Sequence, residues 1–141
     1  MTSLILIICL FCASLTAPPS PCMDVPRPEE IKPYEALWNA TCHVESGFDV
    51  KAIGDKDLKL WSYGIVQIRQ SRLDDYYRLA GIRYSVMDMF DPIKSKEVFM
   101  FYCTGNDMER ISRCWNGGPT GMQKESTIKY WKLIQKQLNN I

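Results

Sequence analysis

The sequence predicts a mostly α-helical protein with one folded domain. Apolar residues recur at helical spacing in five segments, and most of these segments have a recognisable start or stop signal. Strand signals are nearly absent, because only "SYGIVQI" (residues 62–68) is rich enough in β-branched residues to suggest one. The 141 residues are 46% apolar and 23% charged, as in an ordinary globular domain. The formal net charge of +1 gives no indication of a nucleic-acid binder.

Residues 1–17 predict a signal peptide. Residues 4–15 form an apolar run of signal-peptide length that is too short to span a bilayer comfortably, and small residues follow it. No Lys or Arg precedes the run, which leaves an uncleaved anchor as the alternative. We therefore expect a secreted or periplasmic protein.

Residues 18–33 contain six of the eight prolines, and we predict a non-helical linker there. The folded domain is then expected at residues 34–141, because Pro33 suits the first position of a helix.

The first predicted helix begins at Tyr34, carries Glu45 at its end and is stopped by Gly47. Glu45 lies three, four and seven residues after Cys42, Thr41 and Trp38, so it shares their apolar face. Burial would disfavour the charged carboxylate and raise its pKa, as a general acid working near neutral pH requires. From spacing alone, a helix-end glutamate that turns to solvent is the alternative.

The second and third helices are predicted from capping signals. The second begins at Ser71, with Asp74 as its capping-box partner, and ends at Gly81. The third opens at the dipeptide Asp91-Pro92. Its apolar positions are Ile93, Val98, Phe101 and Tyr102.

The last two helices follow the same logic. Asn106 or Asp107 is expected to cap the fourth helix, and Ser126 or Thr127 the fifth. Their apolar positions are Ile111 and Trp115 in the fourth, and Tyr130 or Trp131, Ile134 and Leu138 in the fifth.

Two further segments suggest ligand binding. In "SYGIVQI", the amide-bearing Gln67 follows Gly64 by three residues within an apolar run. "CWNGGPTG" (residues 114–121) combines an aromatic side chain, an amide and three glycines in a turn that lets a ligand approach the backbone. Each segment alone is also consistent with an ordinary buried segment or loop.

Together and in this order, the segments resemble motifs of the soluble lytic transglycosylase family, relatives of goose-type lysozyme. Glu45-Ser46 resembles the "ES" of that family, "SYGIVQI" its "S-x-G-L-M-Q-I" and "CWNGGPTG" its "A-Y-N-A-G-x-G". Tyr130 falls where the family often has a tyrosine. The resemblance covers residues 37–134, nearly all of the predicted domain.

The resemblance implies a lysozyme-like single α domain with a cleft for the glycan strands of peptidoglycan. It implies cleavage of the β-1,4 bond between N-acetylmuramic acid (MurNAc) and N-acetylglucosamine (GlcNAc), with Glu45 protonating the leaving oxygen. The same carboxylate would then take the proton of the muramic acid 6-hydroxyl, which closes a 1,6-anhydro ring without water. The substrate's acetamido group can stabilise the cationic centre, so neither a second carboxylate nor a metal or organic cofactor is implied.

The resemblance also implies substrate-binding residues. Gln67 and Asn116 would offer amides to sugar or acetamido groups from opposite walls of the cleft. Ser62 would hydrogen-bond the glutamate or the substrate, and the hydroxyl of Tyr130 would orient the carboxyl of Glu45.

The chain departs from the family pattern at several positions. Trp115 replaces a tyrosine, and its ring could either stack on a sugar ring or belong to the core. Ile65 and Val66 replace Leu-Met, a change that affects packing more than chemistry. Asp55 or Asp57 could activate a water and give hydrolysis, or could belong to a solvated loop.

The sequence also suggests two rival functions. His43 and Glu45 faintly resemble the H-x-E of zinc deaminases, but Cys103 and Cys114 are not spaced as P-C-x-x-C. The second rival is a catalytically inactive peptidoglycan-binding or assembly protein, against which the retained glutamate argues.

The cysteines leave their own alternatives. After removal of a leader, four remain: Cys22, Cys42, Cys103 and Cys114. In an oxidising compartment they allow three disulfide pairings, and free buried thiols are the alternative. The absence of a CxxC pair among these four argues against a structural zinc site.

Overall fold

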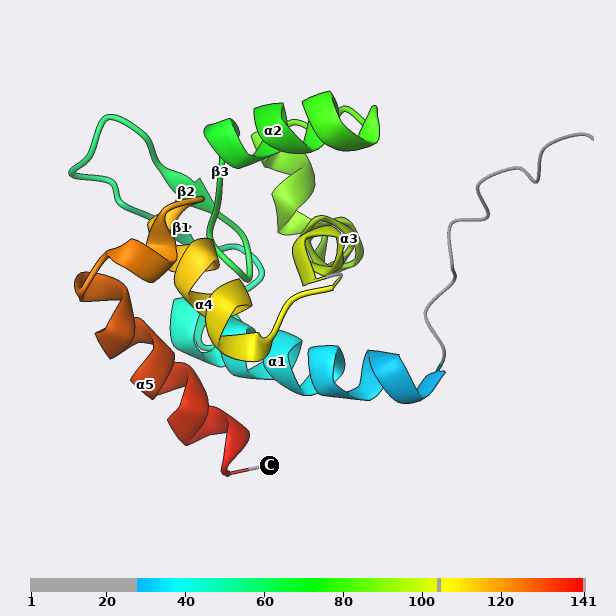
Figure 1. The fold of residues 1–141 in the computed structure, drawn as a ribbon. Helices are drawn as coiled ribbons and strands as arrows, with labels where there is room; N and C mark the ends of the chain where they lie inside the picture. The colour runs from blue at the N-terminus through cyan, green and yellow to red at the C-terminus, as the bar shows by residue number, and fades with distance from the viewer. Residues whose placement is uncertain (1–27, 104, 141) are drawn as a thin grey trace, which may run out of the picture.

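The computed structural model describes residues 28–103 and 105–140 (Figure 1). The α-helices of this part are α1 (Pro28–Ser46), α2 (Gln70–Ala80), α3 (Pro92–Cys103), α4 (Met108–Gly117) and α5 (Ser126–Leu138). Two short 3-10 helices, Val86–Phe90 and Gly121–Gln123, precede α3 and α5. The predicted mostly α class is confirmed. The predicted signal peptide, the linker up to residue 27 and Cys22 lie outside the described residues.

Helix α1 starts earlier than predicted. It begins at Pro28, so the expectation of a non-helical linker was wrong for residues 28–33. A proline at the first helical position sacrifices no hydrogen bond, and Pro28 occupies that position. Pro33 lies inside the helix, where it forgoes one intrahelical bond without ending the helix.

Helix α1 ends as predicted, at a glycine. Gly47 adopts a φ of 61° and its N–H bonds the carbonyl of His43, while the N–H of Phe48 bonds that of Cys42. This left-handed termination satisfies the last carbonyls of the helix. The hydroxyl of Ser46 donates to the carbonyl of Ile65 at 2.8 Å, so the helix end is tied to the following β segment.

A small antiparallel sheet follows α1, in the order β1 (Ile53–Gly54), β2 (Ser62–Tyr63) and β3 (Ile68–Arg69). Ser62 pairs with Arg69, so the segment 62–68 is a tight hairpin rather than one strand. Its turn requires positive φ at Gly64 (76°) and at Gln67 (55°). A Cβ on Gly64 would lie 1.9 Å from the carbonyl oxygen of Met89, so only glycine fits there.

The predicted helix boundaries hold better than the predicted caps. Gly81 ends α2 as predicted, with φ 74°. The capping box of Ser71 and Asp74 was wrong: α2 starts at Gln70, whose side-chain amide donates to Asp74. The sheet determines this start, because β3 leads directly into the helix. At α3, a carboxylate oxygen of Asp91 accepts from the N–H of Ile93.

Of the caps predicted for the last two helices, that of α4 is found and those of α5 are not. Asp107 caps α4 by accepting from the N–H of Arg110 at 2.8 Å, as predicted. Glu125, without a capping side chain, precedes α5, and the predicted caps Ser126 and Thr127 lie within the helix. The hydroxyl of Thr127 lies 2.7 Å from the carbonyl oxygen of Gly121. This hydroxyl, which the sequence predicted as a helix cap, therefore bonds the preceding 3-10 helix instead.

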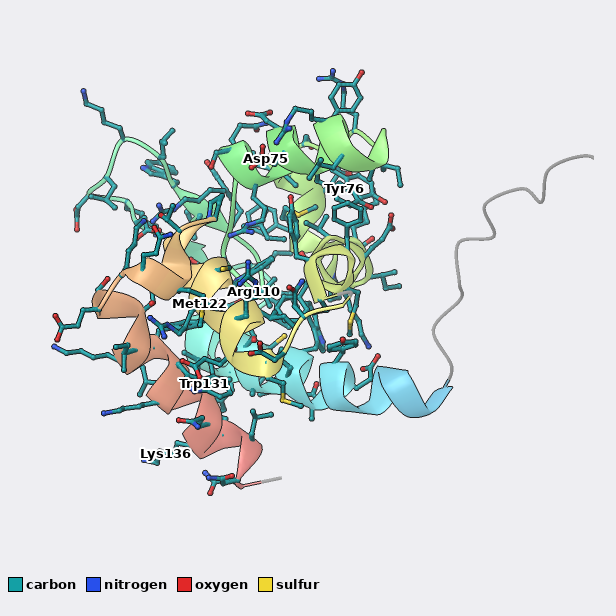
Figure 2. The ribbon with its side chains drawn as sticks, viewed as in Figure 1. Asp75, Tyr76, Arg110, Met122, Trp131 and Lys136 are labelled. Carbon is teal, nitrogen blue, oxygen red and sulfur yellow. The ribbon has the colours of Figure 1, made fainter. Side chains whose placement is uncertain are left out.

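The core lies between α1, α3, α4 and α5, and α5 packs against both α1 and α4 (Figures 1 and 2). Trp38, Phe99 and Trp115 form its aromatic centre, with edge-to-face contacts at centroid distances of 5.4 and 4.9 Å. Burying each such side chain stabilises the fold by about 1.5–3 kcal/mol. Ile93, assigned to the apolar face of the third helix, is instead 77% exposed.

Cys42, Cys103 and Cys114 are free thiols in the described part of the chain. Cys42 and Cys103 are buried in the core, where burial raises the pKa of each thiol to about 12. These two groups therefore behave as small apolar side chains rather than as nucleophiles.

Candidate active site

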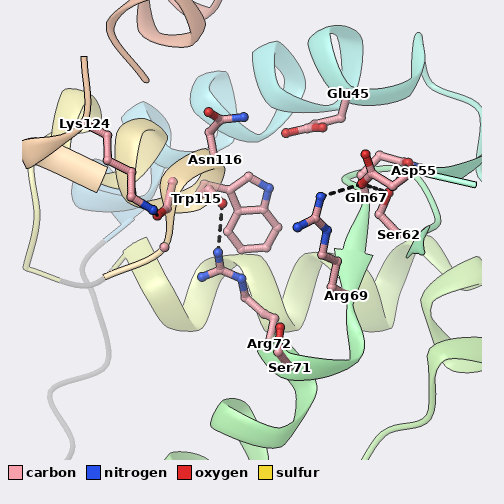
Figure 3. Close-up of a pocket in the computed structure, with 12 residues that line it drawn as sticks. Glu45, Asp55, Ser62, Gln67, Arg69, Ser71, Arg72, Trp115, Asn116 and Lys124 are labelled. Carbon is pink, nitrogen blue, oxygen red and sulfur yellow. Dashed lines mark hydrogen bonds and ion pairs between the residues drawn. The ribbon is translucent and has the colours of Figure 1, made fainter. Parts of the chain in front are cut away.

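A cavity of about 530 Å³ opens where the end of α1, the sheet, the start of α2 and the end of α4 converge (Figure 3). Its volume lies within the range of small-molecule and sugar-sized sites. Its lining is predominantly polar and charged. The lining residues are Glu45, Asp55, Ser62, Gln67, Arg69, Ser71, Arg72, Trp115, Asn116, Gly117, Gly118 and Lys124.

Glu45 projects from the last turn of α1 into this cavity (Figure 3). Burial raises the pKa of its carboxyl to about 7, against the opposing effect of a hydrogen bond from Tyr130. The negative charge of Asp55 raises this pKa further, whereas Arg69 and Arg72 lower it. Near neutral pH the carboxyl is therefore present in both forms and can donate or accept a proton.

The carboxyl of Glu45 is oriented by a buried phenol. The hydroxyl of Tyr130, on α5, donates to Oε1 of Glu45 at 2.7 Å. Tyr130 is itself buried in the core between α1 and α5, and its pKa is raised well above the usual value, chiefly by burial. The phenol thus stays protonated, and remains a hydrogen-bond donor, throughout the pH range in which Glu45 titrates. The family resemblance implied this contact between Tyr130 and Glu45, and the structure has it.

Gln67 lies on the sheet side of the cavity in a strained backbone conformation. Its φ of 55° is rare for a residue with a side chain and costs about 1–2 kcal/mol. Its side-chain N–H donates to the carbonyl of Gly64 at 2.8 Å, and its Oε1 lies 2.7 Å from the hydroxyl of Ser62. A Cβ on Gly54 would lie 2.1 Å from this Oε1, so a glycine is needed beside the amide.

Ser62 connects this amide to an ion pair. Its hydroxyl also lies 2.9 Å from Oδ2 of Asp55, and the same oxygen accepts from Arg69 at 2.7 Å. The single hydroxyl proton can serve either Gln67 or Asp55 at one time. Ser62 is buried, so it organises the wall rather than reaching far into the cavity.

The two aspartates considered for water activation differ in position. Asp55 lines the cavity, and its pKa is lowered mainly by the hydrogen bond from Arg69. Asp57 is exposed and is not among the residues that line the cavity. Asp55 is therefore a carboxylate already engaged by a guanidinium, which makes it a weak base.

Asn116 and Trp115 occupy the facing wall, at the end of α4 (Figure 3). Asn116 is exposed and offers its amide to the cavity. Trp115 is only 8% exposed; its indole N–H donates to the carbonyl of Val66 and its ring packs on Phe99. Trp115 is therefore a core residue. A sugar could contact only the small part of its ring that is exposed.

The cavity brings all six predicted residues together or next to one another: Glu45, Ser62, Gln67, Trp115 and Asn116 line it, and Tyr130 contacts Glu45. The sequence reasoning missed its cations Arg69, Arg72 and Lys124. Their position follows from the tertiary structure, and no spacing distinguishes them from the other basic residues of the chain.

No three His, Cys, Asp or Glu side chains of residues 28–103 and 105–140 are grouped as metal ligands. His43 is exposed and packs edge-on against Phe48, so the deaminase-like pattern gains no support. None of the helices in the described part of the chain is long and apolar enough to cross a membrane.

Comparison with known proteins adds no identification: no family model matches the chain, and no curated protein matches it.

Proposed function

We propose that this protein is a peptidoglycan lytic transglycosylase that cleaves the MurNAc–GlcNAc bond with Glu45 as its single acid and base. One observation carries the proposal: the Glu45 carboxyl lines a polar cavity, has a pKa raised to about 7 and is oriented by Tyr130. The motif resemblance supplies the substrate, and the mostly helical architecture is compatible with a lysozyme-like domain.

In the first step, protonated Glu45 gives its proton to the glycosidic oxygen of the leaving GlcNAc. A pKa near 7 keeps a substantial fraction of the carboxyl protonated at neutral pH, whereas an exposed glutamate would be almost fully ionised. The bond between the muramic acid C1 and this oxygen breaks, and the acetamido group of the substrate stabilises the positive charge at C1.

In the second step, the ionised carboxylate takes the proton of the muramic acid 6-hydroxyl. The hydroxyl oxygen then bonds C1 and closes the 1,6-anhydro ring, so the proton lost in the first step is recovered and no water is consumed. The hydrogen bond from Tyr130 stabilises the carboxylate and so favours the proton donation of the first step, and in the second step it holds Oε1 of Glu45 in a fixed orientation.

The engagement of Asp55 supports ring closure over hydrolysis. A hydrolase of this type would need a base to activate water, yet the carboxylate of Asp55 is bonded by Arg69 and its pKa is lowered. Asp55 also lines the cavity, which keeps a lysozyme-type muramidase as the second candidate.

The proposal is tested by the release of soluble fragments from dye-labelled peptidoglycan sacculi. We expect the wild-type protein to release dye and Glu45→Gln to release none, because glutamine has no transferable proton. Glu35→Gln is the matched control: Glu35 lies on the same helix but pairs with Lys96 and does not line the cavity. Equal release by wild type and Glu45→Gln would refute the role of Glu45. A folded wild-type protein that binds sacculi without releasing dye would indicate the inactive binding protein.

A further inference from the structure

Two cations of the cavity have no carboxylate partner. Arg69, the third cation of the lining, pairs with Asp55. Within the described part of the chain, neither Arg72 nor Lys124 forms an ion pair with an Asp or Glu side chain. Arg72 is half-buried and Lys124 is exposed. The carboxylates of Glu45 and Asp75 act on Arg72 through space without bonding it, so both cations can accept an anion from a ligand.

Arg72 is held in place by contacts on one side of its guanidinium. Nη2 donates to the carbonyl of Trp115 at 2.9 Å, and the group lies over the rings of Trp115 and Tyr102 at 4.4 and 4.9 Å. These contacts occupy one nitrogen and the faces of the plane. Nη2 also lies 3.4 Å from the carbonyl oxygen of Cys114. Nε and Nη1 keep N–H donors, each of which can form a charge-assisted hydrogen bond to a carboxylate.

Lys124 approaches from the segment that connects α4 to α5. Its Nζ donates to the carbonyl of Gly117 at 2.6 Å and the side chain is otherwise exposed. An ammonium group has three donors, so two are left for a ligand. Figure 3 shows Lys124 and Arg72 on the α4 side of the cavity, away from Ser62, Gln67 and Asp55.

Both cations also bond carbonyls at the end of α4, as basic residues often do at helix C-termini. Such capping accounts for one donor of each side chain. It does not account for their shared position on the wall of the cavity that holds Glu45.

We infer that Arg72 and Lys124 form an anion subsite that binds a carboxylate of the glycan substrate. This inference rests on the proposed function and deepens it. A peptide-free muramic acid carries a carboxylate on its lactyl group, whereas in a peptide-bearing strand the lactyl carboxyl is an amide and the carboxylates belong to the peptide. Chitin oligosaccharides contain only GlcNAc and carry no carboxylate. The subsite therefore selects muramic acid strands over chitin.

Binding is measured with the Glu45→Gln protein, which does not consume its ligands. Three tetrasaccharides are compared by titration calorimetry at low and high salt: chitotetraose, peptide-free (GlcNAc–MurNAc)₂ and its peptide-bearing form. We expect at least one anionic tetrasaccharide to bind about tenfold or more tightly than chitotetraose at low salt, with the preference shrinking at high salt.

Variants in the Glu45→Gln background identify the groups responsible. Lys124→Gln should reduce the preference for the anionic tetrasaccharide over chitotetraose about fivefold. Arg72→Lys keeps the charge but loses the planar group that is fixed over the rings of Trp115 and Tyr102, so it should reduce the preference further. Lys129→Gln is the matched control, because Lys129 is an exposed lysine of α5 outside the cavity.

The outcomes separate the subsite from the proposed function. Preference for the peptide-free strand assigns the lactyl carboxylate, and preference for the peptide-bearing strand alone assigns a peptide carboxylate. Equal binding of all three tetrasaccharides, or a preference that Lys124→Gln and Arg72→Lys leave intact, would overturn the subsite and leave the proposed function standing. If none of the three binds and the wild-type protein releases no dye, both fall.

Discussion

Replacing Glu45 by glutamine should stabilise the fold while it abolishes activity. The carboxyl has an ordinary pKa of 4.5 when exposed and a pKa of about 7 in the folded protein. Between these pH values the unfolded chain loses its proton while the folded chain keeps it, so the free energy of unfolding falls as the pH rises through this window. Below pH 4.5 both states are protonated, and above pH 7 both are ionised.

The pKa difference sets the magnitude. At about 1.4 kcal/mol per pKa unit, burial of the ionised Glu45 costs the folded state about 3 kcal/mol at pH 8. Glutamine carries no charge and can still accept the hydrogen bond from Tyr130. We therefore expect Glu45→Gln to be up to about 3 kcal/mol more stable than wild type at pH 8, with most of this gain lost at pH 4.

Urea denaturation followed by tryptophan fluorescence at pH 4, 6 and 8 measures this difference. Glu35→Gln serves as the control, because the Glu35–Lys96 pair is partly exposed, with side-chain exposures of 42% and 37%, and contributes less than about 1 kcal/mol. If the stability difference between Glu45→Gln and wild type does not change with pH, then Glu45 is not a desolvated carboxyl and the reasoning fails.

Three further predictions concern the site and the core. Tyr130→Phe removes a hydrogen bond that stabilises the ionised form of Glu45, so it should raise the pKa of this carboxyl. The decline of activity above about pH 7 should then move to higher pH, and an unchanged pH–rate profile would contradict this. Gly54→Ala should displace the side-chain amide of Gln67 and weaken glycan binding. Gly81→Ala, in open space at positive φ, should cost about 1 kcal/mol of stability without affecting binding. Equal binding by the two variants would argue against the packing of Gly54 on Gln67. In the folded protein iodoacetamide should label Cys114 but not the buried Cys42, as peptide mapping by mass spectrometry can show; rapid labelling of Cys42 would mean that this part of the core is open.

The sequence was informative where local rules decide the structure. Glycines at positions 47 and 81 end α1 and α2 because only a residue without a side chain adopts their left-handed backbone at no cost. Asp107 caps α4 because its carboxylate faces an unpaired N–H one turn on. Spacing placed Glu45 on the buried face, and the structure confirms that burial governs its pKa.

Other features could not be predicted from the local patterns used. Pro28 begins α1 earlier than composition indicated, and "SYGIVQI" folds as a hairpin because Gly64 and Gln67 accept positive φ. The cations Arg72 and Lys124 reach the cavity from α2 and from the segment before α5, a convergence that no linear pattern encodes. Trp115 belongs to the core through its contact with Phe99, a residue of another helix that the spacing of the fourth helix does not reveal.

The most direct test of the account is the mass of the muropeptides that the purified protein releases from peptidoglycan. A transglycosylase with Glu45 in both proton roles yields 1,6-anhydromuramic ends, which are lighter by one water than the corresponding reducing sugars. Products with reducing ends would contradict ring closure and assign water activation to Asp55, and a folded protein that yields no products at all would contradict glycan cleavage itself.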